Sequence, residues 1–536
     1  MLLILLITSL HPTNLSPTPV READAICERC HAKIVHSYLT TPMANASGLA
    51  MEKLRTGTFA NARSGMEYKV SLSGDHGELG YRSLNAPSDA GGLPLNYFLG
   101  SGHLGTTYLY AIGDFLFESP IAWYAPSQSY DMKPGLAELD NMPPPLPMQS
   151  GCMRCHMSSV QPSDAGTINR YRGLPFLHSG ITCEACHGES RQHIATNGKT
   201  GIVNPAKLGP EQRDSVCISC HLEGDVTVER SGHSALNYRP GEPISAYLAY
   251  YVRAGANLTD RAVSEVEQLS QSTCKRATGD QMSCMSCHDP HYTPDEQHRV
   301  AYFRGKCLAC HNRPEFATTH HPENPDCTSC HMPRNGARNV LHVAWTDHRI
   351  RRNRVDSPTE SDAEPAGVLT PIFSPDTSNR DEAMANYQAL LEGDRTLETT
   401  VWRQLNAEGD TLRNDKEALD ALGNISAERR DWAKAEGAFR RVLEIDSADL
   451  TALSNLGTLL AKQGKVKEAE ALLQQAFDRN QDLPGLAKNL ARVQCLAGDE
   501  AAARRTLTTA LIYCPQVDDV RRLLNTLGNC SSASEK

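Results

Sequence analysis

The sequence of 536 residues has no sustained hydrophobic run beyond its first ten residues and no excess of positive charge. The lack of further apolar runs excludes a polytopic membrane protein, because a spanning helix needs about 20 apolar residues. A net charge of -10 and a pI near 6.1 argue against nucleic-acid binding. The 40% share of hydrophobic residues excludes a mostly disordered chain, and the length predicts about two to four domains.

The N-terminal segment 1–25 is predicted to be a signal or leader segment. Met1 to Leu10 reads MLLILLITSL, which is too short to span a bilayer and is typical of the apolar part of a secretory signal. Ala23-Asp24-Ala25 offers a cleavage site between small residues. The alternative is an uncleaved N-terminal anchor that associates with a membrane. A secretory signal predicts a periplasmic or extracellular protein.

The chain is rich in two residue types, with 18 cysteines and 20 histidines. Fourteen of the cysteines lie in a Cys-x-x-Cys-His pentapeptide that occurs seven times. We number these motifs one to seven: Cys27, Cys30 and His31; Cys152, Cys155 and His156; Cys183, Cys186 and His187; Cys217, Cys220 and His221; Cys284, Cys287 and His288; Cys307, Cys310 and His311; and Cys327, Cys330 and His331. Two thiols at this spacing add to the two vinyl groups of one porphyrin, and the following histidine binds its iron.

The alternative interpretation of a single Cys-x-x-Cys pair is half of a zinc site. A histidine follows immediately in all seven cases, which zinc sites do not require. Thioredoxin-type redox pairs do not recur seven times in one chain. The sequence therefore predicts seven covalent haems c. Because bacteria attach haem outside the cytoplasm, the motifs also favour export.

The spacing of the motifs predicts the architecture of the first 350 residues. Motif one stands alone in segment 26–145, where alternating residues between 66 and 125 predict β hairpins, one of them turning at Ile112-Gly113-Asp114. Motifs two to seven crowd into segment 146–350. Little polypeptide remains there for a hydrophobic core, so we expect the haems to form the core, carried by short helices and loops. The predicted fold class is mixed: a haem-packed multihaem cytochrome c with a small N-terminal β element, followed by an all-α solenoid.

Haems that only transfer electrons need a second axial ligand, usually His or Met. The best-placed histidines outside the motifs are His103, His178, His193, His291, His320, His321, His342 and His348. His291 is too close to His288 to cross its own ring, so we expect it to reach a neighbouring haem. Haem one has no well-placed histidine after it except His36, and Met43 is its predicted distal ligand. The sequence does not pair the other ligands with haems.

Several strings resemble a family of multihaem cytochromes c. They include Cys183-Glu-Ala-Cys186-His187-Gly with His193, Cys287-His288-Asp-Pro-His291, Cys330-His331-Met-Pro and Thr346-Asp-His348-Arg-Ile. The family belongs to the broad class that contains the tetrahaem electron carrier of ammonia oxidation, and many members end in tetratricopeptide repeats. The resemblance covers about residues 26–350. It implies haem c, an extracytoplasmic location and electron transfer, and it supports His178, His193, His291, His321 and His348 as ligands.

The C-terminal third carries a repeat with a period of 34 residues. Leu422-Gly423 recurs as Leu456-Gly457, and Ala435 recurs as Ala469 and Ala503. This pattern predicts tetratricopeptide helix pairs over 381–530, including an extra pair at 381–412 and a final helix at 518–528. Segment 351–380 reads as a linker that lets the two halves fold independently. Such solenoids dock proteins, so we expect redox partner proteins to bind here.

The favoured function is that of an electron carrier with a docking tail. The alternative is a multihaem reductase of a small nitrogen or sulfur oxyanion, which acts at one haem with an open distal position. Several such enzymes carry Lys in place of a motif His, and here every motif ends in His. Cys274-Lys275, shortly before motif five, is the one feature that could place a thiolate or an amine over a haem.

Overall fold

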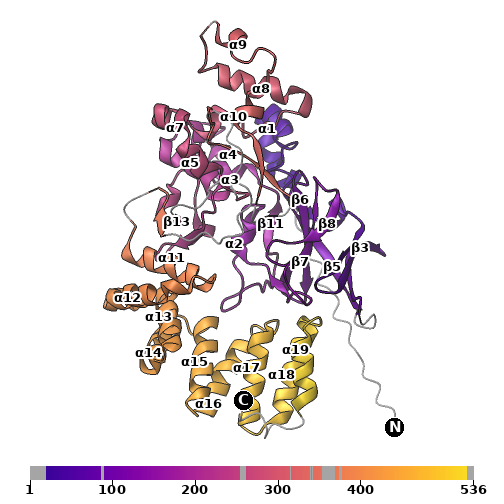
Figure 1. The fold of residues 1–536 in the computed structure, drawn as a ribbon, viewed down its shortest axis with the longest axis vertical. Helices are drawn as coiled ribbons and strands as arrows, with labels where there is room; N and C mark the ends of the chain where they lie inside the picture. The colour runs from indigo at the N-terminus through magenta and orange to yellow at the C-terminus, as the bar shows by residue number, and fades with distance from the viewer. Residues whose placement is uncertain are drawn as a thin grey trace.

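The computed structural model describes residues 20–85, 90–253, 261–313, 315–337, 340, 342–352, 368–373 and 377–527. Figure 1 shows three parts: a β-sheet, a region of short helices that carries most of the motifs, and a helical solenoid. Most of the predicted leader lies outside the described residues. Asp24, near its predicted end, already belongs to the folded body: it is 2% exposed, and its carboxylate accepts a hydrogen bond from Cys183 N at 3.0 Å.

The first helix, α1 (Val20–Tyr38), precedes a nine-stranded antiparallel sheet. Its strands are β1 (Ser47–Leu49), β2 (Gly57–Asn61), β3 (Met66–Ser73), β4 (His76–Ser83), β5 (Ala90–Leu99), β6 (Gly105–Ile112), β7 (Phe115–Tyr124), β8 (Ser129–Met132) and β9 (Leu146–Pro147). Strands β2 to β8 pair in chain order, while β1 pairs with β5 and β9 with β7.

The sheet forms because alternate residues of its strands are apolar and share one face. Tyr68, Tyr108 and Phe117 are fully buried in its core. The predicted turn at Ile112-Gly113-Asp114 is confirmed: Ile112 pairs with Phe115, and Gly113 adopts a φ of +59°. The sheet is larger than the small β element predicted from the sequence.

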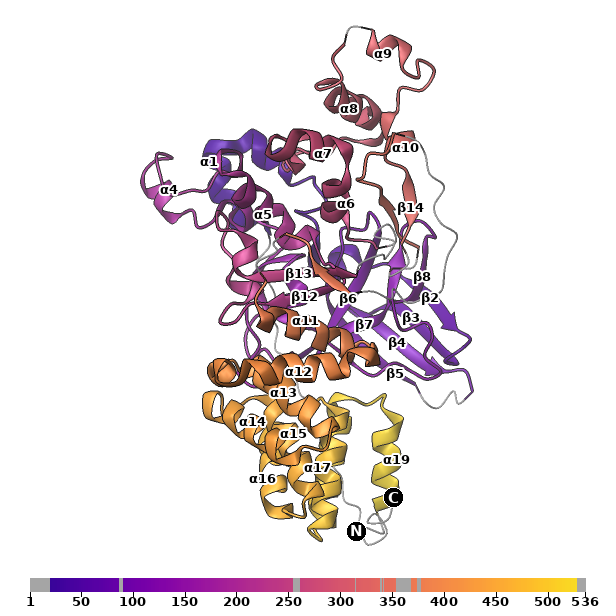
Figure 2. The same ribbon diagram turned by 60° about the vertical axis from the view of Figure 1, so that its left-hand side comes forward.

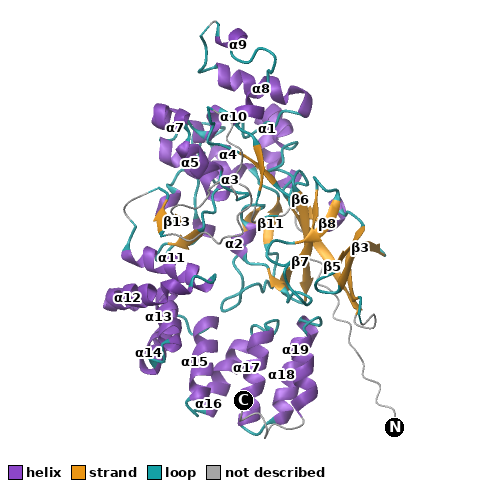
Figure 3. Ribbon diagram, in the orientation of Figure 1, coloured by secondary structure: helices purple, strands orange, loops and turns teal. Residues whose placement is uncertain are grey.

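The region of motifs two to seven consists of short elements joined by loops, as Figure 3 shows by colour. Its helices are α2 (Ser150–Met153), α3 (Cys183–His187), α4 (Arg191–Ala195), α5 (Pro210–His221), α6 (Glu265–Gln271), α7 (Thr273–Thr278), α8 (Glu296–Leu308), α9 (Phe316–Thr319) and α10 (Cys327–His331). Three small antiparallel sheets join β10 (Met157–Val160) to β11 (Phe176–Ser179), β12 (Val226–Glu229) to β13 (Leu248–Arg253) and β16 (Leu369–Pro371), and β14 (Arg334–Gly336) to β15 (Ala344–Thr346). The larger apolar clusters of the described residues lie in the N-terminal sheet and the tail instead.

The tail is a stack of antiparallel helices. They are α11 (Asn379–Leu391), α12 (Glu398–Glu408), α13 (Lys416–Glu428), α14 (Trp432–Ile445), α15 (Leu450–Lys462), α16 (Val466–Phe477), α17 (Pro484–Leu496), α18 (Glu500–Tyr513) and α19 (Asp518–Thr526). The predicted repeat is confirmed, and its glycines are explained by packing. A Cβ on Gly423 would lie 2.5 Å from the Phe439 ring, and one on Gly457 would lie 2.7 Å from Leu473. Glycine therefore lets the paired helices cross closely.

The tail packs against the rest of the protein near both of its ends (Figure 2). At the first end, α11 shares an apolar cluster with β12 and β13, and Arg230 and Arg253 pair with Asp381 and Asp394 at 2.7 and 3.0 Å.

At the far end, the Tyr513 ring meets Phe115 edge-on at 5.1 Å. Strand β16, inside the predicted linker, pairs with β13. The two halves therefore share extended contacts, contrary to the prediction that a linker separates them.

Candidate haem-binding site

The seven motifs lie on short helical turns: α1, α2 and the turn after it, α3, α5, a 3-10 turn at Cys284–Ser286, the end of α8, and α10. A helical turn places two cysteines three residues apart on one face and leaves the following histidine beside them. At motif one the helix kinks at His31, whose φ and ψ are -118° and 31°. Each motif therefore presents its thiols and its imidazole together.

The motif cysteines differ in their exposure. Most motif cysteines are partly buried by the polypeptide, and four are exposed: Cys30, Cys152, Cys310 and Cys330.

Cys30 shows how one thiol of a motif comes to lie at the surface of the polypeptide. Helix α1 is buried at Asp24 and again at Val35, but every residue from Glu28 to Ile34 is exposed. Cys27 is partly buried one turn earlier, so motif one has one thiol turned toward the protein and one toward the solvent. Cys30 remains a predicted haem-attachment residue because of its place in the pentapeptide.

Thiols of different motifs lie close enough to shift each other's pKa. The Cys183 thiol lowers the pKa of Cys27, and the Cys155 thiol lowers that of Cys220. The other such pairs are Cys217 with Cys284 and Cys307 with Cys327. Weaker charge effects link Cys186 to Cys220 and Cys287 to Cys310. Taken together, the close thiol pairs and the weaker charge effects link the motifs in the order one, three, four, five, six and seven, with motif two beside motif four.

Three motif histidines face a second histidine from a distant part of the chain. The ring centroids are 6.3 Å apart for His31 and His193, 5.9 Å for His187 and His291, and 6.3 Å for His288 and His348. The first two pairs are nearly parallel, with interplanar angles of 15° and 12°. One iron between two imidazoles needs this spacing: metal–nitrogen bonds of about 2 Å put the centroids about 6.3 Å apart.

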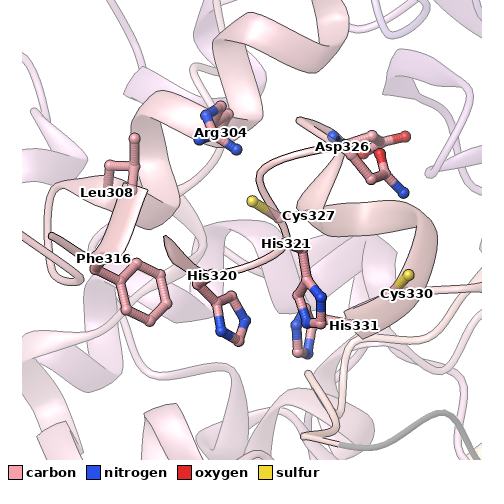
Figure 4. A pocket seen from close by; sticks show the side chains of 10 residues that line it. Arg304, Leu308, Phe316, His320, His321, Asp326, Cys327, Cys330 and His331 are labelled. Carbon is pink, nitrogen blue, oxygen red and sulfur yellow. Dashed lines mark hydrogen bonds between the residues drawn. The ribbon is translucent and has the colours of Figure 1, made fainter. Parts of the chain in front are cut away.

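At motif seven, two adjacent histidines lie beside His331, as Figure 4 shows. The centroid of His320 is 5.9 Å from that of His331, and the centroid of His321 is 6.4 Å from it. One ligand atom from each of the three rings lies within 4.8 Å of the others. His320 and His321 are both among the better-placed candidates from the sequence, and the resemblance favours His321.

Hydrogen bonds fix the orientation of several of these rings. The Nδ1 atoms of His187 and His331 lie 2.8 and 2.6 Å from the carbonyl oxygens of Val203 and Arg351. Nδ1 of His348 lies 2.8 Å from the carbonyl oxygen of Thr346. A ring that donates from Nδ1 leaves Nε2 free to bind a metal. Burial lowers the pKa of His288 to about 4, which keeps it in the neutral form that binds metals.

Helix α1 helps to position the histidines that face motifs one and three. The Ser37 hydroxyl donates to the carbonyl oxygen of His291 at 2.7 Å, and the Tyr38 ring meets the His291 ring edge-on. The Tyr38 hydroxyl donates to Ile181 at the entry to motif three. The expectation that His291 reaches beyond its own motif agrees with this geometry.

The remaining predicted ligands lie elsewhere. His103 is exposed in the turn between β5 and β6. His342 lies against Tyr124, with its Nε2 2.7 Å from Asp131. His178, on β11, pairs across the sheet with Ser158 just after motif two, and its buried Nδ1 has no hydrogen-bond partner among the described atoms. Met43 is half-buried, and its carbonyl oxygen accepts from Ile181 N.

His156, His221 and His311 have no second histidine ring stacked against them in the described part of the chain. His311 stacks on Phe316 at 5.0 Å instead. Burial lowers the pKa of His156, and the neighbouring His221 lowers it further. These three motifs therefore differ from motifs one, three, five and seven.

The cysteines outside the motifs have other surroundings. Cys274 is half-buried near Cys310, while Lys275 donates from Nζ to the Met282 carbonyl oxygen at 2.7 Å. In the tail, Cys514 is a buried free thiol that donates to a carbonyl, and Cys495 is disulfide-bonded.

Comparisons with known proteins give a match in the region of the motifs and another in the helical tail. The family model of cytochrome c554 and c-prime matches residues 130–188, which contain motifs two and three, and a tetratricopeptide repeat model matches residues 426–484. The chain is a multihaem cytochrome with a tetratricopeptide tail. The multiheme cytochrome MtrA of Shewanella baltica (strain OS185) is 24% identical to this cytochrome over 212 residues, which cover 37% of this chain and 56% of that protein. This cytochrome thus spans little more than half the length of that relative.

Solved structures similar to the multihaem cytochrome include PilF of Pseudomonas aeruginosa and residues 41 to the end of MamA from Desulfovibrio magneticus RS-1. The first is 22% identical, covers 28% of this chain and 69% of its own, and has a TM-score of 0.25. The second is 18% identical, covers 30% and 91%, and has a TM-score of 0.26. No helix among the described residues is long and apolar enough to cross a membrane.

Proposed function

We propose that this cytochrome is an exported electron carrier that binds seven covalent haems c, one at each motif. Haem c supplies an iron that cycles between the ferric and ferrous states. The observation that carries the proposal is the set of facing histidine rings, with centroids 5.9 to 6.4 Å apart. Two imidazoles on one iron leave no position for a substrate, so such sites are suited to electron transfer.

The facing rings support four proposed distal ligands. His193 completes haem one, His291 haem three and His348 haem five, while haem seven takes His320 or His321. His193 thereby replaces Met43 as our proposed ligand of haem one, because its ring stands opposite His31 at the spacing that an iron requires. His178 remains a proposed ligand near motif two, where its buried Nδ1 is unpartnered.

The links between thiols of different motifs support a path for electrons. These links run from motif one through three, four, five and six to seven, with motif two as a branch at four. Thiols mark the edges of the porphyrins, so neighbouring thiols bring neighbouring rings close together. The chain would then hold its haems in one connected series rather than as separate centres.

A second candidate is a reductase of a small nitrogen or sulfur oxyanion. The observation in its favour is that His156, His221 and His311 lack a facing histidine among the described residues. An iron held only by its motif histidine would have an open position for a substrate. Lys275 does not support this candidate, because its amine is already bonded to a backbone carbonyl.

Export and partner docking complete the proposal. Attachment of haem outside the cytoplasm and the disulfide at Cys495 both favour an extracytoplasmic location. Tetratricopeptide helices commonly bind proteins, so redox partner proteins are the proposed ligands of the tail. The tail contacts the cytochrome body through α11, Asn480 and Tyr513, and the solenoid surface away from these contacts is proposed for this role.

A haem count and a spin-state measurement test the proposal. A pyridine haemochrome assay on protein matured in a host with c-type haem attachment should give seven haems per chain. Electron paramagnetic resonance of the oxidised protein should show low-spin signals for at least four haems. A high-spin signal would favour the reductase, and a protein that binds zinc but no haem would overturn both functions.

A further inference from the structure

A surface cavity of about 590 Å³ opens in the segment between β12 and β13. His233, Asn237, Tyr238, Arg239, Glu242 and Tyr247 line it. None of its lining residues is a motif cysteine or histidine. A porphyrin touches the thiols of its motif along one edge, so the cavity does not hold the thioether-bearing edge of a haem.

The cavity borders several motifs. Its 3-10 turn, Ala235–Asn237, contacts α2 of motif two. Gly241 packs on Val203, whose carbonyl oxygen lies 2.8 Å from Nδ1 of the motif-three histidine, His187. Burial raises the pKa of Tyr238, and the 3-10 turn Ile244–Ala246 at the end of the cavity segment contacts α5, which carries motif four. The cavity thus lies at the branch point of the motif series.

The walls combine aromatic rings with groups that exchange protons. The Tyr247 ring meets His233 edge-on at 5.1 Å and Tyr238 edge-on at 5.7 Å. The Tyr247 hydroxyl donates to the Glu242 carboxylate. On the inner side, the buried Tyr238 hydroxyl has no hydrogen-bond partner among the described atoms, while His233 and Arg239 face the solvent.

We propose that this cavity binds a planar, redox-active aromatic molecule of the hydroquinone class and passes its electrons to the haems of motifs three and four. The size of the cavity favours an organic ring, since pockets for such molecules occupy about 300–1,000 Å³. A small oxyanion would fill only a minor part of it. The inference rests on the proposed function, because the electrons leave through the haems.

The reaction balances with the groups present. A hydroquinone loses its two O–H bonds and forms two C=O bonds, so that it becomes a quinone and releases two electrons and two protons. Haems held by motifs three and four would each accept one of these electrons. The imidazole of His233 takes one proton, and Glu242 takes the other through the Tyr247 hydroxyl that is bonded to it.

Stopped-flow reduction of the oxidised holoprotein by 2,6-anthrahydroquinone disulfonate, without oxygen, tests this site. The rate should saturate with hydroquinone concentration, which shows that binding precedes transfer. His233→Ala and Tyr247→Ala should each raise the half-saturating concentration about three- to tenfold, the range expected for one lost aromatic contact. His76→Ala, which removes an exposed histidine from β4, is the matched control and should behave like the parent protein.

Each outcome bears on a different claim. Rates that rise linearly in the parent protein, or variants that do not differ from the control, would overturn the site. It would also be overturned if Arg239→Leu shifted a haem midpoint potential and left saturation unchanged, since the cavity would then serve a haem propionate. Reduction by dithionite and the haem count are measured on every variant. A protein that fails those two measurements contradicts the proposed function instead.

Discussion

The ion pair between Arg230 and Asp381 joins the cytochrome body to the tail, and its removal tests whether the two halves stabilise each other. Arg230 Nη1 lies 2.7 Å from Asp381 Oδ2, and the two side chains are 22% and 3% exposed. Removing one partner of a buried pair costs about 3–5 kcal/mol. After Asp381→Asn, Nε of Arg230 still donates to the Ser245 carbonyl oxygen at 2.6 Å. We therefore expect a loss near the lower limit, about 3 kcal/mol in the free energy of unfolding.

Urea unfolding of the holoprotein, followed by far-ultraviolet circular dichroism, measures this loss. The matched control is Glu444→Gln, which removes the exposed pair between Arg441 and Glu444 on α14 and should cost less than about 1 kcal/mol. Limited trypsin digestion should also release the tail faster in Asp381→Asn than in the control. If Asp381→Asn costs no more than Glu444→Gln, the contact does not hold the halves together, and the reasoning from burial is refuted.

Two further substitutions test the haem ligands and the tail packing. His193→Met should raise the midpoint potential of one haem, because a thioether ligand favours the ferrous state, and spectroelectrochemistry that shows no change would contradict the assignment of His193 to haem one. Gly457→Val should cost about 1–3 kcal/mol, because its Cβ would lie 2.7 Å from Leu473 and 3.2 Å from the Ala469 carbonyl oxygen. Gly437→Ala, with nothing within 4 Å of the added Cβ, is the control, and equal thermal midpoints would contradict the packing argument.

The sequence predicts those parts of this protein that depend on the spacing of residues along the chain. Two thiols and an imidazole within five residues reveal a haem motif wherever it lies. The Leu-Gly positions recur at the helix crossings, so the repeat could be predicted before the contact of Gly423 with Phe439 was seen. In both cases the residues that act together are near neighbours in the chain.

Contacts between residues that lie far apart in the sequence could not be predicted in the same way. His193 follows motif three, yet its ring stands opposite His31 of motif one. The reason is that α1, which carries motif one, packs against motif three. Met43 is the nearer candidate along the sequence, whereas His193, our proposed ligand, is brought opposite His31 by the fold. Likewise, the sequence shows Asp381 only as an acidic residue in the first turn of a predicted helix. Its burial against Arg230 in the fold reveals the interface between the tail and the cytochrome body.

The far end of the tail provides the last prediction, which concerns pH. Asp482, at the entry to α17, is 1% exposed, and this burial raises its pKa to about 6, although the charge of Arg170 lowers it in part. Its neighbour Asn480 donates to the Gly166 carbonyl oxygen of the cytochrome body at 2.8 Å, so Asp482 lies beside the interface between the two halves. In the unfolded chain an aspartate has a pKa of about 3.9.

An acid whose folded pKa is raised favours folding only while it is protonated. Below pH 4 the carboxyl is protonated in both states and costs nothing. The cost grows as pH rises through 4 to 6 and reaches about 3 kcal/mol above pH 6, because each pKa unit corresponds to about 1.4 kcal/mol. Asp482→Asn removes this ionisation. We therefore expect the variant to be about 2–3 kcal/mol more stable than the parent at pH 7.5 and to lose most of that advantage at pH 4.5. Urea unfolding at both pH values measures the difference, in which the other titrating groups cancel. A difference that is the same at both pH values would show that Asp482 ionises normally and that its burial does not perturb it.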